Sequence, residues 1–191
     1  MNLLHGVGIN DRKYPSVVKG KAKKEYQLWV NMISRCYNQK LKSKCPAYKD
    51  CTVSDNFKNY SYFYEWCQNQ IGFGVDGFQL DKDFLSNCDK KIYTEELCVF
   101  VPCEINSFFC DKRKTVGQYP IGVCFNSTVG KFQATCCIGK SKQKLLGHFP
   151  TPEEAYSVYK QFKEARSKEL AQKWQSKIDN RVYEILINWS I

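Results

Sequence analysis

Apolar residues recur at helical spacing in four stretches of the chain. In residues 22–37, and again in about residues 55–69, they stand three to four positions apart, as on the buried side of an amphipathic helix. The third stretch starts at Thr151, where a capping Thr, a Pro at the first helical position and a Glu three residues after the cap predict a long helix. The spacing returns in residues 178–189. The pattern therefore predicts a helix in each of these places.

Short apolar runs separated by turn residues precede the long helix. Residues 119–125, 131–138 and 143–149 form three such runs, with Asn, Ser, Gly and Lys between them, which predicts an antiparallel sheet of three strands. One side of the following helix carries apolar residues that would cover one face of this sheet: Ala155, Val158, Tyr159, Phe162 and Ala165. The other face of the sheet is then left open.

A different order of elements is expected between Leu80 and Asn106. We expect a strand that ends in residues 80–83, a turn rich in Asn, Cys and Asp, a second strand over residues 98–101 and a helix that begins at Pro102. Proline suits the first helical position because its missing N–H would have no partner there. The whole chain is thus expected to be α+β, with helices leading into a ββα core and then the three-stranded sheet packed on one long helix.

This stretch also places oxygen-bearing side chains near each other. In an extended strand Asp81 and Asp83 share one face and Lys82 points the other way, so that the carboxylates face the helix that carries Glu104 and Asn106. Such a set of oxygen ligands suits a hard cation, Mg²⁺ more than Zn²⁺. The alternative is an ordinary acidic turn on a basic protein, because D-x-D is common by chance.

Composition limits the class of protein. The 191 residues are 43% hydrophobic and 25% charged, with mixed signs, so one or two small folded domains are expected rather than disorder. No apolar run approaches the roughly 20 residues of a membrane span, and the first residues lack the pattern of a secretion signal. We expect a soluble, cytoplasmic protein that is not secreted and has no membrane partner.

The eleven cysteines are expected to be mostly reduced and buried. Their number is odd, none form a C-x-x-C pair, and several stand inside apolar runs, which does not favour a disulfide framework. A structural zinc ion is the less favoured alternative. Its ligands would come from Cys45 and Cys51, or from Cys103 and Cys110 on the Asn106 side of the helix.

The net charge of +10 is unevenly distributed. Residues 1–70 hold 12 basic and 5 acidic side chains, residues 71–106 hold 3 and 7, and residues 107–191 hold 14 and 7. Basic flanks around an acidic centre are typical of a protein that contacts a polyanion with each flank and holds a cation between these two contacts. A basic surface without a partner would give the same composition.

The sequences L-D-K-D, E-x-C-x-F-V-P and I-N occur in this order, and they resemble the ββα-metal core of phage-borne HNH homing endonucleases. R-C-Y-N, P-x-Y and the aromatic residues of the second predicted helix resemble the scaffold that precedes this core. The resemblance implies a DNA endonuclease with Mg²⁺ or another divalent cation held by Asp81 and Asn106. Asp83, on the same face as Asp81 by strand alternation, would be a third ligand. The resemblance also puts Lys82 at the position of the His that acts as general base, and Cys98 at that of a middle Asn.

Two functions follow from this departure. In an active enzyme, the metal would polarise the scissile phosphate, Asp83 or a metal-bound water would replace the His as base, and Lys82 could instead hold a phosphate. In the alternative, the chain is a catalytically inactive descendant that binds DNA or a host protein as a regulator or inhibitor. A phage-encoded protein would act in the host cytoplasm.

A second resemblance covers about residues 119–174. The sequences P-I-G-V, G-K-F-Q-A, L-G-H-F and T-P-E-E-A resemble the Apetala-type DNA-binding domain of ethylene-response factors, which is also found appended to phage HNH proteins. This resemblance implies that the open face of the sheet enters the major groove of double-stranded DNA. The residues facing DNA would be Cys124, Lys131, Gln133, Thr135, Cys137, Gln143 and Leu145. Plant members have Arg and Trp at several of these positions, so contacts to the DNA backbone are expected here more than base readout.

Lysines surround the predicted DNA-binding face. Lys140, Lys142 and Lys144 flank it together with Lys131, and the basic linker Lys112, Arg113 and Lys114 precedes it. The expected organisation is a basic arm over residues 1–21, a helical scaffold and HNH-like core over residues 22–114, the Apetala-type domain over residues 115–175 and a C-terminal helix over residues 176–191. The expected partner is double-stranded DNA, with no small-molecule substrate.

Overall fold

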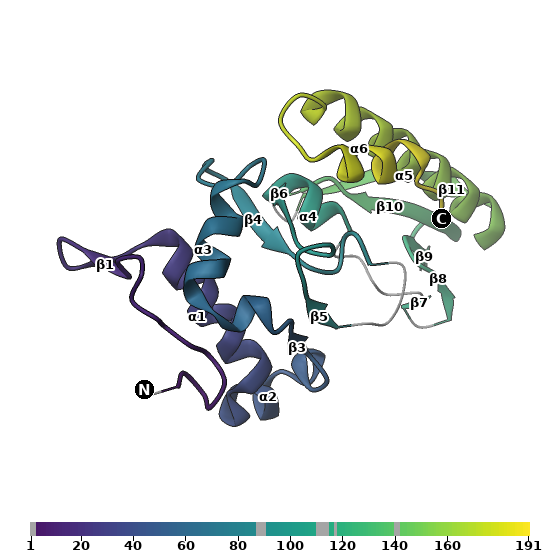
Figure 1. Ribbon diagram of the computed structural model, residues 1–191. Coiled ribbons are helices and arrows are strands. Elements are labelled where there is room, and N and C mark those ends of the chain that lie inside the picture. The colour runs from purple at the N-terminus through teal and green to yellow at the C-terminus, as the bar shows by residue number, and fades with distance from the viewer. Residues whose placement is uncertain (1–2, 87–90, 110–114, 117, 140–141) are drawn as a thin grey trace. The chain divides into compact units, whose positions relative to one another are not determined.

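The computed structural model describes the chain except for residues 1–2, 87–90, 110–114, 117 and 140–141 (Figure 1). The protein is α+β, as expected, with helices and several small sheets. It divides into two compact units, Met1–Val101 and Pro102–Ile191. This boundary precedes helix α4 (Cys103–Phe109), whereas the sequence had suggested the basic linker that follows it.

The first unit is built around an aromatic core. Its helices are α1 (Lys24–Tyr37), α2 (Gln39–Lys44) and α3 (Tyr60–Gln68), with short 3-10 turns η1 (Pro46–Tyr48) and η2 (Asn56–Lys58). Trp29, Phe57, Tyr60 and Phe63 are fully buried, and the Trp29 indole N–H donates a hydrogen bond to the Phe57 carbonyl. The predicted helices are confirmed, and their aromatic residues serve mainly as packing surface.

The N-terminal segment, expected to be an extended or loose basic arm, is attached to the first unit at several points. Strands β1 (Val17–Val18) and β2 (Lys21–Ala22) form an antiparallel hairpin. Ile9 exchanges backbone hydrogen bonds with Lys58 and Tyr60. The Tyr14 ring stacks on Tyr64 with centroids 4.0 Å apart. The sequence did not predict these attachments, because isolated contacts to distant residues leave no periodic pattern.

Two small sheets complete the first unit. Strand β3 (Thr52–Val53) pairs in parallel with β5 (Ile92–Tyr93), and β4 (Phe78–Asp81) pairs with β6 (Val99–Pro102). All four residues of β6 are buried. The two predicted strands are therefore present, and residues 87–90 of the turn predicted between them lie outside the described residues. However, β4 ends at Asp81, two residues earlier than expected, and Pro102 belongs to the strand rather than to the helix.

The second unit contains the three-stranded sheet. Strands β9 (Val123–Asn126), β10 (Lys131–Cys137) and β11 (Gln143–Phe149) are antiparallel in the order β11-β10-β9, and α5 (Pro152–Trp174) lies over one face (Figure 1). The start of α5 is as predicted, because the Thr151 hydroxyl accepts a hydrogen bond from the Glu154 amide at 3.2 Å. The short hairpin of β7 (Thr115–Val116) and β8 (Tyr119–Pro120) precedes the sheet.

The first predicted strand of this sheet is interrupted at Gly122. The chain forms β8, turns, and resumes as β9, and Gly122 has a φ of +79°. A Cβ atom at this position would overlap the Tyr159 ring of α5. Only glycine combines this left-handed backbone with so close an approach of the ring.

Helix α5 packs on more than the sheet. Ala155 and Tyr159 are buried as predicted, but Phe162 is only partly buried and Ala165 is exposed. The buried side continues instead through Lys163, Ser167, Leu170 and Ala171. It turns away from the predicted stripe because the last turns of α5 face α4 and α6 (Asn180–Asn188) instead of the sheet.

The C-terminal helix packs back on α5. Val182 and Leu186 of α6 are fully buried, and the Ser167 hydroxyl donates to the Leu186 carbonyl at 2.7 Å. Trp189 then lies against the rings of Phe108 and Phe109 from α4. The second unit therefore has a core of its own. Its first helix, α4, and its last helix, α6, both pack against α5.

Candidate functional site

The open face of the three-stranded sheet is defined by strand alternation on β10. Ala134 and Cys136 are buried toward α5. The residues that alternate with them, Gln133, Thr135 and Cys137, are half-buried, and Lys131 at the start of the strand is exposed. Because successive side chains point to opposite sides of a sheet, these four residues lie on the face away from α5.

The strand register adds residues from both neighbours to this face. Gln133 stands opposite Cys124 of β9, Thr135 opposite Leu145 of β11, and Cys137 opposite Gln143. Directly opposite residues of an antiparallel pair share a face. The seven residues predicted to face DNA are therefore gathered on one face of the sheet, which we call the open face: Cys124, Lys131, Gln133, Thr135, Cys137, Gln143 and Leu145.

Polar groups on the open face are only partly engaged with one another. The Asn126 side-chain amide donates to Gln133 Oε1 at 3.0 Å, which sets the orientation of the Gln133 amide. His148 stands opposite Gln133 in β11, and in the part of the chain that the structure describes its Nε2 atom is buried without a hydrogen-bond partner. Leu145 is 52% exposed. The face thus offers amides, a hydroxyl and apolar groups to a partner.

The predicted lysines are not all on the open face. Lys131 and Lys142 are exposed, and Lys142 stands in the turn between β10 and β11, where its N–H donates to the Gly139 carbonyl. Lys144 is opposite the buried Cys136 and has its Nζ 4.8 Å from the centre of the Phe162 ring of α5. Alternation puts Lys144 on the helix side of the sheet, which corrects its assignment. Lys140, Lys112, Arg113 and Lys114 fall outside the described residues.

The acidic turn after β4 has a geometry that differs from the predicted one. Lys82 and Asp83 lie in a bend, so strand alternation does not apply to them. Oδ1 of Asp81 accepts hydrogen bonds from the amides of Asp83, at 2.8 Å, and Phe84, at 2.7 Å. One carboxylate oxygen of Asp81 therefore closes the turn, in the manner of an Asx turn.

Lys82 is the buried cation of this turn. Its side chain is only 6% exposed, and Nζ lies 2.5 Å from Asp83 Oδ1 and 5.6 Å from the centre of the Tyr93 ring. The Tyr93 hydroxyl in turn accepts a hydrogen bond from Arg35 at 3.4 Å. Lys82 and Asp83 thus form an ion pair at the edge of the core. The sequence had suggested that they point to opposite sides.

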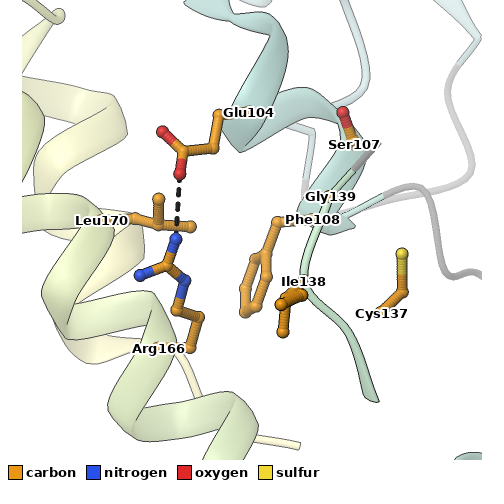
Figure 2. A pocket seen from close by; sticks show the side chains of 8 residues that line it. All are labelled: Glu104, Ser107, Phe108, Cys137, Ile138, Gly139, Arg166 and Leu170. Carbon is orange, nitrogen blue, oxygen red and sulfur yellow. Dashed lines mark hydrogen bonds and ion pairs between the residues drawn. The ribbon is translucent and has the colours of Figure 1, made fainter. Parts of the chain in front are cut away.

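Glu104 does not serve the acidic turn in the way the sequence suggested. Its carboxylate accepts a hydrogen bond from Arg166 at 2.9 Å (Figure 2). It also accepts hydrogen bonds from Lys173 at 2.5 Å and Trp174 at 3.2 Å, and all three donors are on α5. Burial opposes the ionisation of Glu104, but these hydrogen bonds and the two cationic charges outweigh it and lower its pKa. Glu104 therefore holds α4 on α5.

A small cavity lies beside this network. It measures about 10 Å³, which is the room that a single water molecule needs, and Figure 2 shows the side chains that surround it. Its lining comes from α4, α5 and the end of β10: Glu104, Ser107, Phe108, Cys137, Ile138, Gly139, Arg166 and Leu170. The cavity is too small for an organic ligand.

The first unit has a wider, open groove beside β3 and β5. Its volume is about 570 Å³. Asp50, Glu96 and Lys91 line it together with Thr52, Ile92, Thr94 and Leu97. This groove could not be predicted from the sequence, because its residues come from segments about 40 positions apart.

The predicted metal ligands fall in different units. Asp81 and Asp83 belong to the first unit and Asn106, on α4, to the second. Among the described residues, no three His, Cys, Asp or Glu side chains gather in a group that could hold a metal ion. For the proposed zinc ligands, Cys45 is half-buried, Cys51 is buried and Cys103 is exposed, while Cys110 lies outside the described residues.

No helix in the described parts of the chain combines the length and apolar character of a membrane span. Comparison with protein-family models, curated proteins and solved structures finds no match for the chain.

Proposed function

We propose that this chain binds double-stranded DNA through the open face of the β9–β10–β11 sheet. The observation that carries the proposal is the gathering of seven polar, apolar and basic side chains on the one face that α5 leaves uncovered. The motifs that resemble the Apetala-type domain lie in the same segment. We also propose that the whole chain descends from phage HNH proteins, whose motifs it resembles.

The dimensions of the sheet suit the major groove. Neighbouring strands lie about 4.8 Å apart, so three strands are roughly 10 Å wide between the outer backbones, close to the roughly 12 Å width of the groove. Residues 102–191 hold 14 Lys and Arg against 8 Asp and Glu. Such an excess attracts the phosphate backbone and releases counterions when the two associate.

The side chains of the open face favour adenine and thymine where bases are contacted. None of the three strands contains Arg, the side chain that most often reads guanine. Gln133 and Gln143 carry amides of the kind that pair with adenine N6 and N7, and Leu145 offers an apolar contact for the thymine methyl group. We therefore propose phosphate contacts from Lys131 and Lys142, with a modest preference for A·T pairs.

Binding is favoured over cleavage by the Lys82–Asp83 ion pair. The position that the HNH resemblance assigns to the general base holds a buried ammonium group, which has no lone pair to accept a proton. The same ammonium is bound to Asp83, the carboxylate that would replace the missing base. Metal-dependent hydrolysis through Asp81, Asp83 and Asn106 is thus the second candidate, and the experiment below separates the two.

The binding experiment compares two nearby lysines, Lys142 in the exposed turn between β10 and β11 and Lys144 on the α5 side of the sheet. We expect Lys142→Ala to weaken binding to a fluorescent duplex several-fold and to reduce the salt slope by about one. Lys144→Ala removes the same charge on the α5 side and should have a clearly smaller effect. Gln133→Ala should reduce the ratio of the affinities for an A·T and a G·C duplex, by at most about tenfold.

The cleavage experiment incubates the same protein with supercoiled plasmid, with Mg²⁺ and with chelator. We expect binding without nicking. Metal-dependent nicking that disappears in Asp81→Ala would establish the second candidate instead. Failure to bind any duplex at low salt, by folded protein, would overturn the proposal as a whole.

A further inference from the structure

Two buried thiols of the first unit are in direct contact. Cys36 in α1 and Cys51, just before β3, have their sulfur atoms 3.2 Å apart, and both residues are 0% exposed. The Cys36 thiol is the donor of this contact, and its sulfur also lies 3.6 Å from the Thr52 carbonyl oxygen. Since a disulfide bond is about 2.05 Å long, the sulfurs need to approach each other by roughly 1.1 Å to bond.

The surroundings make the two thiols chemically unequal. The hydrogen bond from Cys36 lowers the pKa of Cys51, and the positive charges of Lys82 and Lys42 act in the same direction against the effect of burial. The hydrogen bond to Cys51 and burial both raise the pKa of Cys36. Cys51, whose sulfur accepts the contact from Cys36 and lies near the positive charges of Lys82 and Lys42, is the thiol of the pair that ionises more readily.

Two other buried thiols of the first unit differ from this pair. Cys67 and Cys98 are also 0% exposed, and burial raises the pKa of each. They resemble small apolar core residues. The contact at Cys36 and Cys51 therefore needs an explanation beyond packing.

We propose that Cys36 and Cys51 are a site of reversible oxidation, at which a peroxide converts the two thiols into an intramolecular disulfide. The Cys51 thiolate attacks one oxygen of hydrogen peroxide and becomes a sulfenic acid, and the departing hydroxide takes up a proton to leave as water. Cys36 then attacks the Cys51 sulfur, and its proton leaves with the hydroxyl group as a second water. Two thiols and one peroxide thus give one disulfide and two waters. A small dithiol reductant reverses the step.

The disulfide would join α1 to the segment that leads into β3. It would close a loop of about 15 residues, which restricts the unfolded chain. For a chain of this size we expect the melting temperature of the first unit to rise by about 5–10 °C on oxidation. This site is independent of the proposed DNA-binding face, so either proposal can fail alone.

The test treats the reduced full-length protein with hydrogen peroxide, blocks the remaining thiols and maps tryptic peptides without reduction. Lys40, Lys42, Lys44 and Lys49 separate the two cysteines, so the disulfide appears as a linked pair of peptides that dithiothreitol resolves. We expect this pair to form before any other modification of cysteine. Recovery of Cys36 and Cys51 as blocked thiols, while the exposed Cys103 or Cys124 is oxidised, would overturn the proposal.

Single substitutions distinguish the two roles. Cys36→Ser should leave Cys51 as a sulfenic acid that a dimedone probe labels, whereas Cys51→Ser should lose both the disulfide and the label at this site. Cys124→Ser, which removes an exposed thiol, should leave the linked peptides unchanged. Equal labelling of Cys36 in Cys51→Ser would contradict the assignment of Cys51 as nucleophile. If a substitution prevents folding, peptide mapping of the unchanged protein still decides.

Discussion

Lys82 illustrates how one side chain determines the chemistry of its neighbourhood. A buried ammonium group is costly unless it is paired, and here Asp83 and the Tyr93 ring supply the compensation. Once it is paired, Lys82 is a structural cation. Its ammonium group therefore ties the acidic turn to the core of the first unit.

Gly122 is the position of the second unit where the structure most strictly requires glycine. We expect Gly122→Ala to lower the free energy of unfolding by about 2 kcal/mol or more, because a Cβ adds a clash with the Tyr159 ring to an unfavourable backbone conformation. Urea unfolding followed by far-UV circular dichroism would measure the loss.

Gly130→Ala is the matched control for this substitution. Gly130 also has a positive φ, of +67°, but nothing lies within 4 Å of an added Cβ. Its replacement should therefore lower the free energy of unfolding by only about 1 kcal/mol, which is the cost of a left-handed backbone conformation for a residue with a Cβ. Equal losses in the two variants would show that the Tyr159 ring moves aside.

Helix α4 shows how an element can depend on its neighbours. With only seven residues it is too short to be stable alone. Glu104 binds three donors of α5, and Lys163 of α5 donates to the Phe108 carbonyl at 3.0 Å with its Nζ 4.1 Å from the Phe108 ring centre. These contacts explain why α4 belongs to the second compact unit.

The Glu104 network should make this attachment sensitive to acid. Because the pKa of Glu104 is lowered in the folded protein, its carboxylate stabilises the fold above the usual value of 4.5, and this contribution is lost as the pH falls through the lowered pKa. Glu104→Gln should therefore reduce stability at pH 7 by about 1 kcal/mol, a figure discounted for partial exposure. Once the pH has fallen below this lowered pKa, the variant and the unchanged protein should unfold alike.

Thermal unfolding at several pH values would measure this convergence. Glu153→Gln, at an exposed position in the first turn of α5, removes the same charge and should leave the melting temperature nearly unchanged at pH 7. A constant difference between Glu104→Gln and the unchanged protein from pH 7 to pH 3 would contradict an ionic role for Glu104.

At the scale of the whole molecule, the position of the boundary determines which fragments can fold. A fragment of residues 102–191 keeps α4 on α5, whereas residues 115–191 would leave Lys163 without its carbonyl partner and Trp189 without the Phe108 ring. We expect the longer fragment to unfold cooperatively. The shorter fragment should melt at a clearly lower temperature, because it exposes apolar surface and a buried polar group.

Circular dichroism in the near and far ultraviolet would compare the two fragments at equal concentration. If the longer fragment also binds duplex DNA, the open face binds DNA without the first unit. Equal melting temperatures for both fragments would place the folding boundary at the basic linker instead.

The sequence by itself determined those features whose causes are local. Thr151, Pro152 and Glu154 predict the start of α5 because a helix cap involves residues within one turn. Strand alternation likewise predicts a common face for Gln133 and Thr135. Such signals depend on spacing along the chain and not on a distant partner.

Only the tertiary structure decided the features that depend on residues far apart in sequence. Lys163 and Ser167 are buried because α4 and α6 supply carbonyl groups 55 and 19 positions away, which no polar pattern on α5 reveals. The contact of Cys36 with Cys51 and the burial of Lys82 arise in the same way. A side chain's environment is set by the segments that fold against it, and its chemistry follows from that environment.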